Sequence, residues 1–316
     1  MKPLLAILDD YQGVALSCAD FDSLRAHFDI RVYQRAFADE QETVAELGDA
    51  EVLVAMRERT RLSRSVLECL PKLRYIVTTG MRNAAIDMAA AAERGILVSG
   101  TGMSKHAAGE LTWALVMAAA RHIPAEVAGM RSGGWQSTVG TELNGRTLGI
   151  VGLGHIGTQV ARYGQAFGMT VQAWSPNLDA DRAAALNVAA VPKDKLFAES
   201  DVVSLHLVLS ERTRGVVGAH DLALLGPTGL LVNTSRGPLV EEAALVEALS
   251  NGVLGAAALD VYDIEPLPAS HPLRTLPNVV ATPHIGFVTD KSYGVAYPQA
   301  VEDIQAWLAG APIRLL

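Results

Sequence analysis

The chain has 316 residues and a formal net charge of -8; half of its residues are hydrophobic and 19% are charged. This length exceeds one ordinary core and suits two domains of roughly 150 residues each. The acidic balance excludes a general attraction to nucleic acid or anionic lipid, and no apolar run reaches the roughly 18 residues that a membrane span needs.

The start of the chain and its cysteines predict a cytoplasmic protein. The opening MKPLLAILDD contains only a short apolar run before two acids, which is too short for a secretory signal peptide. Cys18 and Cys69 are too few for a disulfide framework and lack CxxC spacing, so we expect a reducing compartment and buried structural thiols.

Two series of strand-like runs alternate with segments of helical period. The first series is PLLAIL, EVLVA, RYIVTT and GILVS, and the second runs from RTLGIVG through MTVQAW, DVVSLHLVL, GLLVN, VLGAAALD and NVVAT. This alternation is typical of βαβ units and a parallel sheet. The sequence therefore predicts an α/β protein with two doubly wound, Rossmann-like domains.

A long apolar helix is predicted between the two series. Ser104 could cap the segment KHAAGELTWALVMAAARHI, whose apolar face contains Leu111, Leu115, Ala118 and Ala119. A helix that is apolar on most sides must be buried, either within the monomer or against a second copy of the chain.

The loop GLGHIG places Gly152, Gly154 and Gly157 in GxGxxG spacing between a strand-like run and a segment of helical period. The first glycine permits a tight turn, the second lets the backbone approach a pyrophosphate, and the third lets the helix pack on the strand. The helix N-terminus adds amide donors and a positive dipole. This context predicts a dinucleotide site, and the alternative is a glycine turn without a ligand.

Three further stretches complete an ordered set of motifs: NTSRG at 233–237, LDVYDIEP at 259–266 and TPHIG at 282–286. With this set, the chain resembles the D-isomer-specific 2-hydroxyacid dehydrogenases over nearly its whole length. The resemblance implies a discontinuous, flavodoxin-like substrate domain of residues 1–103 and 284–316, and an inserted NAD(P)-binding Rossmann domain of residues 104–283. It also implies a homodimer that pairs through residues 111–120, and no regulatory C-terminal domain is expected.

The resemblance implies a catalytic set of Arg236, Glu265 and His284. A guanidinium can bind the carboxylate of a 2-keto acid and polarise its carbonyl, as expected of Arg236. An imidazolium can protonate the alkoxide that forms as hydride arrives from nicotinamide, as expected of His284. A neighbouring carboxylate raises the pKa of an imidazole and orients the ring, as expected of Glu265. Each residue alone could be a surface pair, a loop cap or a turn histidine, but their order beside a dinucleotide loop favours one mechanism.

The resemblance also implies further cofactor contacts. His155 and Ile156 would offer backbone amides to the pyrophosphate, and Asp260 matches the acid that faces the nicotinamide carboxamide. Val208 replaces the usual proline at a position that contacts adenosine by shape. Three other matched residues are expected at the cofactor site: Thr213, Thr234 and Ser235. Apart from the resemblance, His155 in the glycine loop and His206 after a strand could line the cofactor cleft without a part in catalysis.

Ser175 in VQAWSPN stands where NAD enzymes of this architecture carry an acid, about 20 residues beyond the glycines. That acid binds the adenine ribose and repels a 2'-phosphate, whereas a serine hydroxyl supplies no repulsion. A preference for NADP over NAD would need a nearby Arg or Lys to bind the 2'-phosphate, and residues 176–179 offer none. The nearest arginine, Arg182, is expected on the following helix. The sequence therefore predicts that both NAD and NADP are used.

Substrate-side positions depart more from the family. Arg57 stands where the resembled family has an arginine. Glu58 stands where the family has a small serine, and Arg82 where it usually has a glycine. The amides after Gly80, beginning at Met81, would cradle the substrate carboxylate as a backbone nest. Arg82 could bind an extra anionic group or pair with Glu58, and pairing is favoured because a desolvated, unpaired cation is costly.

These features favour an enzyme that reduces a small 2-keto acid to a 2-hydroxy acid, without a metal. A formate dehydrogenase is less favoured because that branch replaces the catalytic glutamate by glutamine, and Glu265 is retained. The same fold also serves as a dinucleotide-sensing transcriptional corepressor, which is the alternative from a different functional class. The identity of the keto acid stays open.

Overall fold

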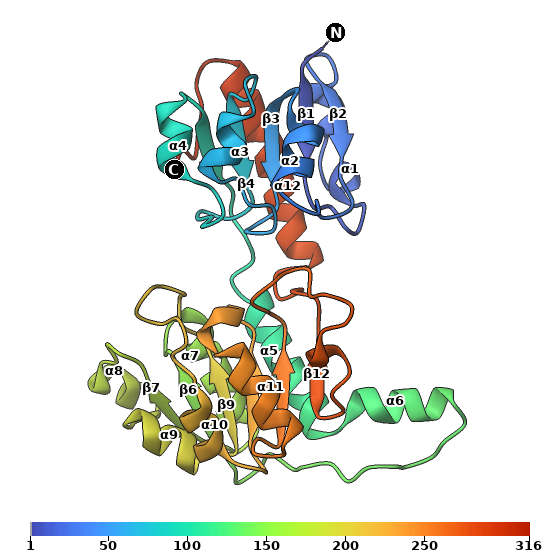
Figure 1. The fold of residues 1–316 in the computed structure, drawn as a ribbon. Helices are drawn as coiled ribbons and strands as arrows, with labels where there is room; N and C mark the ends of the chain where they lie inside the picture. The colour runs from blue at the N-terminus through green and yellow to red at the C-terminus, as the bar shows by residue number, and fades with distance from the viewer. Residues whose placement is uncertain (1) are drawn as a thin grey trace. The chain divides into compact units, whose positions relative to one another are not determined.

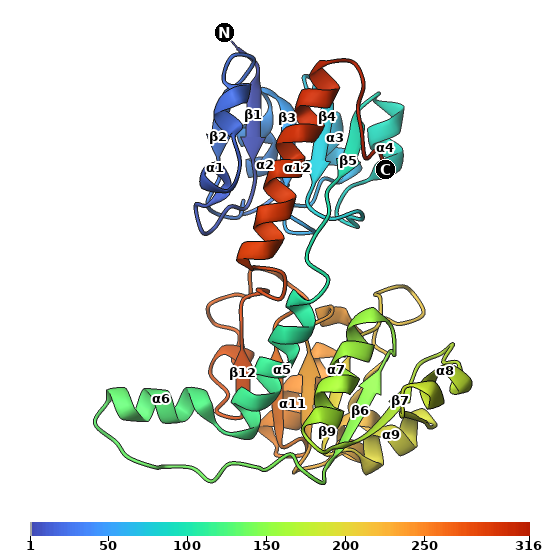
Figure 2. The same ribbon diagram turned by 180° about the vertical axis from the view of Figure 1, so that it is seen from behind.

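The computed structural model describes residues 2–316 and divides the chain into two compact units. Unit 1 comprises the described residues up to Ser104 together with Val288–Leu316, and unit 2 is Lys105–Phe287. Each unit is built on one parallel sheet, seen from opposite sides in Figures 1 and 2. The prediction of two α/β domains is therefore confirmed. Residue 1, which the predicted substrate domain includes, lies outside the described range.

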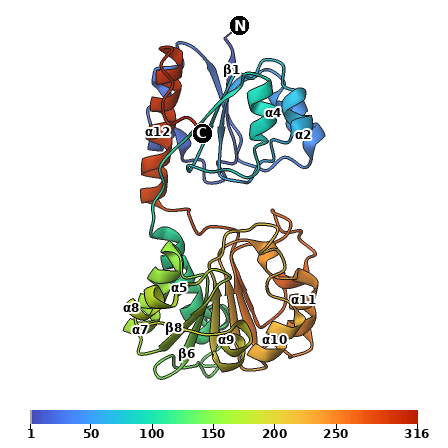
Figure 3. The same cartoon turned by 90° about the vertical axis from the view of Figure 1, so that its left-hand side faces the viewer.

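Unit 1 contains a five-stranded parallel sheet in the order β2-β1-β3-β4-β5, which is the flavodoxin-like order. The strands are β1 (Leu4–Ile7), β2 (Asp29–Val32), β3 (Ala50–Ala55), β4 (Tyr75–Thr78) and β5 (Leu97–Gly100). Its helices are α1 (Ala15–Cys18), η1 (Phe21–Leu24), α2 (Glu40–Leu47), α3 (Arg64–Glu68), α4 (Met88–Glu93) and α12 (Asp290–Leu308). Figure 3 shows α12 on one face of this sheet and α2 and α4 on the other. Because both faces are covered, β1 and β4 are continuously buried.

Unit 2 contains a seven-stranded parallel sheet in the order β12-β11-β10-β9-β6-β7-β8. The strands are β6 (Thr147–Val151), β7 (Thr170–Trp174), β8 (Ala189–Ala190), β9 (Val202–Leu205), β10 (Leu230–Asn233), β11 (Ala256–Leu259) and β12 (Val279–Ala281). The helices are α5 (Ala107–Ala120), α6 (Ile123–Arg131), α7 (His155–Ala166), α8 (Ala180–Ala185), α9 (Lys193–Glu199), α10 (Ala219–Leu225), η2 (Gly237–Leu239), α11 (Glu242–Ser250) and η3 (Pro272–Arg274). The strand order reverses between β6 and β9, and ligands bind at such switch points, outside the carboxyl ends of the strands.

Helix α5 is buried within unit 2. It packs against α7 and the strands β10 to β12, and its buried residues include Leu115 and Val116. Burial within the monomer therefore explains its apolar sequence, which no longer argues for a dimer through this segment. The predicted cap is wrong, because the helix begins after His106 and no side chain caps it.

Two further findings concern possible membrane spans and the exposure of the two cysteines. No helix within residues 2–316 combines the length and apolar character that crossing a membrane would require. Cys18 is half-buried, whereas Cys69 is exposed beside the end of α3, so the expectation of a buried thiol is wrong for Cys69.

Candidate functional site

The glycine loop joins β6 to α7 and requires glycine at two positions. Gly152 has φ of +101°, and a Cβ there would lie 2.8 Å from the backbone carbonyl oxygen of His206. A Cβ at Gly157 would lie 2.1 Å from the carbonyl oxygen of Gly152. Gly154 precedes α7, which no side chain caps. The first amides of such a helix lack intrahelical partners, so the cradle, with His155 and Ile156 at its first turn, fits a phosphate group.

Ser175 follows the carboxyl end of β7 and is half-buried. The next carboxylate, Asp179, caps α8 by accepting the N–H groups of Asp181 (3.0 Å) and Arg182 (3.2 Å), so Arg182 lies on the predicted following helix. Sequence reasoning missed Lys193, whose Nζ binds Asp221 at 2.8 Å and lies 5.9 Å from the Trp174 ring centre. That cation is already paired with a carboxylate.

The loop after β9 is closed by Thr213. Its hydroxyl donates to the carbonyl oxygen of Val208 (2.7 Å) and accepts the N–H of Ser210 (2.8 Å). Val208 is 78% exposed, which leaves its side chain accessible at the rim of this loop. His206 bonds the Ser204 hydroxyl through Nε2 at 2.9 Å, and burial lowers the pKa of His206 to about 3. The ring is therefore neutral near pH 7 and is unsuited to acid catalysis.

The three catalytic candidates follow β10, β11 and β12, which are neighbours in the sheet. His284 Nδ1 lies 2.5 Å from Glu265 Oε2. The other oxygen of Glu265 accepts the backbone N–H of Tyr262 at 3.0 Å, which fixes the orientation of the carboxylate. Because Nδ1 faces Glu265, the nitrogen suited to exchange a proton with a substrate is Nε2.

Asp260 holds the TPHIG segment in place. This fully buried carboxylate accepts the Thr282 hydroxyl (2.6 Å) and the N–H groups of Ile285 and Gly286 (both 2.8 Å). Burial raises the pKa of Asp260, and these hydrogen bonds oppose the shift. The observed contacts thus assign Asp260 to the loop that carries His284. They also explain why residues 284–287 belong to unit 2, in contrast to the sequence-based boundary after residue 283.

Arg236 lies in a turn that hydrogen bonds fix on several sides. Its Nη1 donates to the Ser235 carbonyl oxygen at 2.7 Å, and the Ser235 hydroxyl donates to the Leu205 carbonyl oxygen at 2.9 Å. The hydroxyls of Thr234 and Thr112 of α5 lie 2.7 Å apart. A Cβ on Gly237 would lie 2.1 Å from the backbone carbonyl carbon of Tyr262. The Arg236 turn therefore packs directly on the segment that leads to Glu265.

The substrate candidates of unit 1 follow β3 and β4. The Arg57 N–H donates to the Thr79 hydroxyl at 3.0 Å, and a Cβ on Gly80 would lie 2.0 Å from Arg57 Nη1. Glu58 lies beside Arg57, with 3.9 Å between its Oε2 and Arg57 Nε. Arg82 is exposed and forms no ion pair within residues 2–316, so the favoured pairing of Arg82 with Glu58 is wrong.

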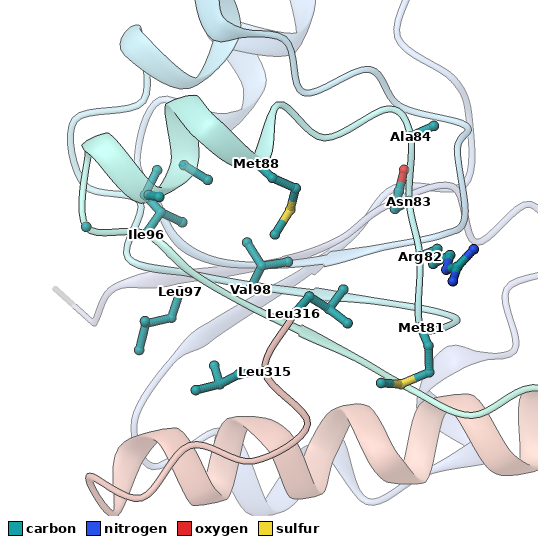
Figure 4. A pocket seen from close by; sticks show the side chains of 13 residues that line it. Met81, Arg82, Asn83, Ala84, Met88, Ile96, Leu97, Val98, Leu315 and Leu316 are labelled. Atoms are coloured by element: carbon teal, nitrogen blue, oxygen red, sulfur yellow. The ribbon is translucent and has the colours of Figure 1, made fainter. Parts of the chain in front are cut away.

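Met81 and Arg82 border a cavity of about 820 Å³ in unit 1, shown in Figure 4. Its lining is mostly apolar and comprises residues 81–84, Met88, Ala91, Ala92, residues 95–98, Leu315 and Leu316. Arg57 and Gly80 are not part of this lining. The structure therefore brings Arg57 and Gly80 together, but it does not gather all four substrate candidates around one cavity of this unit.

Comparison with known proteins gives consistent matches. The family model described as the NAD binding domain of D-isomer specific 2-hydroxyacid dehydrogenase matches residues 113–286. A D-3-phosphoglycerate dehydrogenase of Methanocaldococcus jannaschii is 39% identical over 274 residues, covering 85% of this chain and 52% of the relative. The chain thus spans about half the length of such relatives.

Other relatives match over most of their length. A glyoxylate reductase of Aeropyrum pernix is 35% identical over 298 residues, which is 91% of this chain and 89% of the relative. The solved structure of a phosphoglycerate oxidoreductase from Vibrio cholerae is 38% identical, with a TM-score of 0.91 over 98% of this chain and all of the other.

Proposed function

Because the chain belongs to the D-isomer-specific 2-hydroxyacid dehydrogenase family, we propose that it transfers a hydride between NAD(P)H and C2 of a small 2-keto acid. The observation that carries this proposal is the contact of 2.5 Å between His284 Nδ1 and Glu265, beside the turn of Arg236. When bound, the nicotinamide supplies the hydride. The side chains of the protein bind the acid and move one proton.

In the direction of reduction, Arg236 binds the substrate carboxylate and polarises the neighbouring carbonyl. The hydride adds to the carbonyl carbon, and protonated His284 gives its Nε2 proton to the oxygen, so that a hydroxyl forms. Glu265 stabilises the positive imidazole during this step and holds the ring in place. Oxidation reverses each transfer.

We assign the cofactor to the carboxyl edge of the unit 2 sheet. The clash that a Cβ would produce at Gly152 or Gly157 supports a backbone cradle for the pyrophosphate. Val208 and Thr213 would border the adenosine. Near the nicotinamide would lie Thr234, Ser235 and Asp260. On the substrate side, we propose that Arg57 and the amides after Gly80 bind the carboxylate.

Steady-state assays test the activity directly. We expect oxidation of NADH or NADPH with at least one of glyoxylate, hydroxypyruvate, pyruvate or a bulkier 2-keto acid, at more than about 1 per second. Tight cofactor binding without turnover of any of these acids would contradict the proposal and would favour a dinucleotide-sensing corepressor.

The protein should use both NADH and NADPH, with a preference of less than about a hundredfold, because a neutral hydrogen bond from Ser175 changes binding by only about 0.5 to 1.5 kcal/mol. Ser175→Asp should shift the ratio of kcat/KM values toward NADH, since it adds repulsion of the 2'-phosphate. Ser175→Asn is the uncharged control. A preference of about a thousandfold in the unaltered protein would overturn this prediction and point first to Arg182.

We also propose a homodimer that buries α6 and residues 132–140. Figures 1 and 2 show this stretch extending away from the sheet of unit 2. Every residue of it is at least partly exposed, including Met130 (56%), Trp135 (76%) and Val139 (92%). Such a group of exposed apolar side chains is typical of an interface.

Light scattering should therefore give twice the chain mass of 33.5 kDa. Met130→Asp combined with Trp135→Ser should give the monomer mass, whereas the surface control Leu16→Asp in unit 1 should not. A mass near 33.5 kDa for the unaltered protein at all concentrations would reject the dimer.

A further inference from the structure

The carboxylate of Glu242 contacts both ends of the segment, residues 263–271, that carries Glu265. The Oε2 atom of Glu242 accepts the backbone N–H of Asp263 at 3.2 Å, and Oε1 lies 3.1 Å from His271 Nε2. Asp263 and His271 are the two ends of a stretch with Glu265 inside it. The side chains of Glu242 and His271 are only 22% and 20% exposed, so water competes weakly for this contact.

The tautomer of His271 suits this arrangement. Its Nδ1 accepts the N–H of Leu273 at 3.3 Å, which places the proton of the neutral ring on Nε2, facing Glu242. The middle of the segment is held separately, because Arg274 Nε donates to the carbonyl oxygen of Pro268 at 2.9 Å and Leu267 is buried. Glu242 is therefore the group that fixes both ends.

Glu242 is also connected to Arg236. It is the first residue of α11, which follows Arg236 through the short helix η2. At the other side of that turn, Gly237 packs on the backbone of Tyr262 and Asp263, where a Cβ would lie 2.1 Å and 2.6 Å from the nearest atoms. The element that carries Arg236 thus touches the Glu265 segment twice, once by packing and once through the Glu242 carboxylate.

We propose that Glu242 is a positioning residue that keeps Glu265 against His284 and fixes both relative to Arg236. It touches none of the reacting atoms, and its role rests on the proposed function. Catalytic groups lose much of their effect when they are misplaced by about 1 Å, so release of the segment should lower kcat more than it changes binding.

The test compares Glu242→Ala with Glu247→Ala, which removes an exposed carboxylate from the same helix. For Glu242→Ala we expect kcat to fall about tenfold or more, with the KM of the keto acid and the Kd of NADH changed by less than about threefold. Glu242→Gln keeps an oxygen for the Asp263 N–H but turns an NH₂ group toward His271, so it should be intermediate. Glu247→Ala should match the unaltered protein.

A second readout does not depend on turnover. The proton between His284 Nδ1 and Glu265 should give a downfield proton NMR signal, because an imidazole N–H that donates to a carboxylate is strongly deshielded. This signal should broaden or disappear in Glu242→Ala and persist in Glu247→Ala. His271→Ala removes only the contact of Glu242 with the end of the segment at residue 271, so it should cause part of the loss seen in Glu242→Ala. The double variant should lose little more than Glu242→Ala alone, since Glu242→Ala already removes that contact.

The outcomes separate the two proposals. An unaltered protein that turns over no keto acid but loses the signal in Glu242→Ala would retain the positioning role and reject the proposed reaction. Unchanged kcat and an unchanged signal in Glu242→Ala would overturn the positioning role alone. Equal losses of kcat, NADH affinity and melting temperature in Glu242→Gln and His271→Ala would also overturn it, by indicating a general structural role.

Discussion

Replacing His284 by alanine should lower kcat by about a hundredfold or more while leaving the Kd of NADH nearly unchanged, because the change removes proton transfer alone. The cofactor cradle lies after β6, whereas His284 follows β12. The segment of His284 is held through its backbone by Asp260, so the loop should keep its fold when the imidazole is lost.

His220→Ala is the matched control for this experiment. His220 is an exposed histidine on α10, 71% accessible at its side chain and 3.7 Å from Asp194. It should retain the unaltered kcat. Unaltered kinetics in His284→Ala would mean that another group supplies the proton, and a large loss of NADH affinity would mean that the imidazole has a binding role instead.

Arg236→Lys should raise the KM of the keto acid by about tenfold to a hundredfold at saturating NADH, because an ammonium group cannot form two parallel bonds to a carboxylate. The guanidinium of Arg236 is oriented by the Ser235 carbonyl oxygen, which lies 2.7 Å from its Nη1. A lysine would lose this orientation as well as the planar donor pair. The measurement is a series of initial rates against keto-acid concentration.

Arg162→Lys is the control for that substitution, since Arg162 is an exposed arginine on α7 in the same unit. It should leave KM unchanged. If Arg236→Lys also leaves KM and kcat unchanged, Arg236 does not bind the substrate. A loss confined to NADH affinity would place Arg236 at the cofactor.

The sequence motifs could indicate that the three proposed catalytic residues lie at one edge of the sheet because of how parallel sheets are built. Arg236, Glu265 and His284 each follow a different strand, and those three strands are neighbours in the sheet. Their carboxyl ends therefore share one edge, so motifs far apart along the chain come together. Strands with buried apolar runs were also predictable, whereas the exposed edge strands β2 and β8 were not, because they lack such runs.

Side-chain contacts between segments far apart in the sequence could not be predicted. Asp260 was expected to face the cofactor, and only the structure places its carboxylate on the amides of Ile285 and Gly286. Glu242 meets His271 across 29 positions without any sequence signal. The apolar pattern of α5 required burial but could not distinguish its own sheet from a second copy.

The most direct test of the proposed reaction is isotope transfer from NADH carrying deuterium on both faces of C4 to hydroxypyruvate or pyruvate, whose reduction creates a stereocentre at C2. We expect a 2-hydroxy acid of D configuration with the deuterium on C2, formed at least about a hundredfold more slowly by His284→Ala. A product of L configuration, or a hydroxy acid without deuterium at C2 from NADH labelled on both faces, would contradict the proposed reaction.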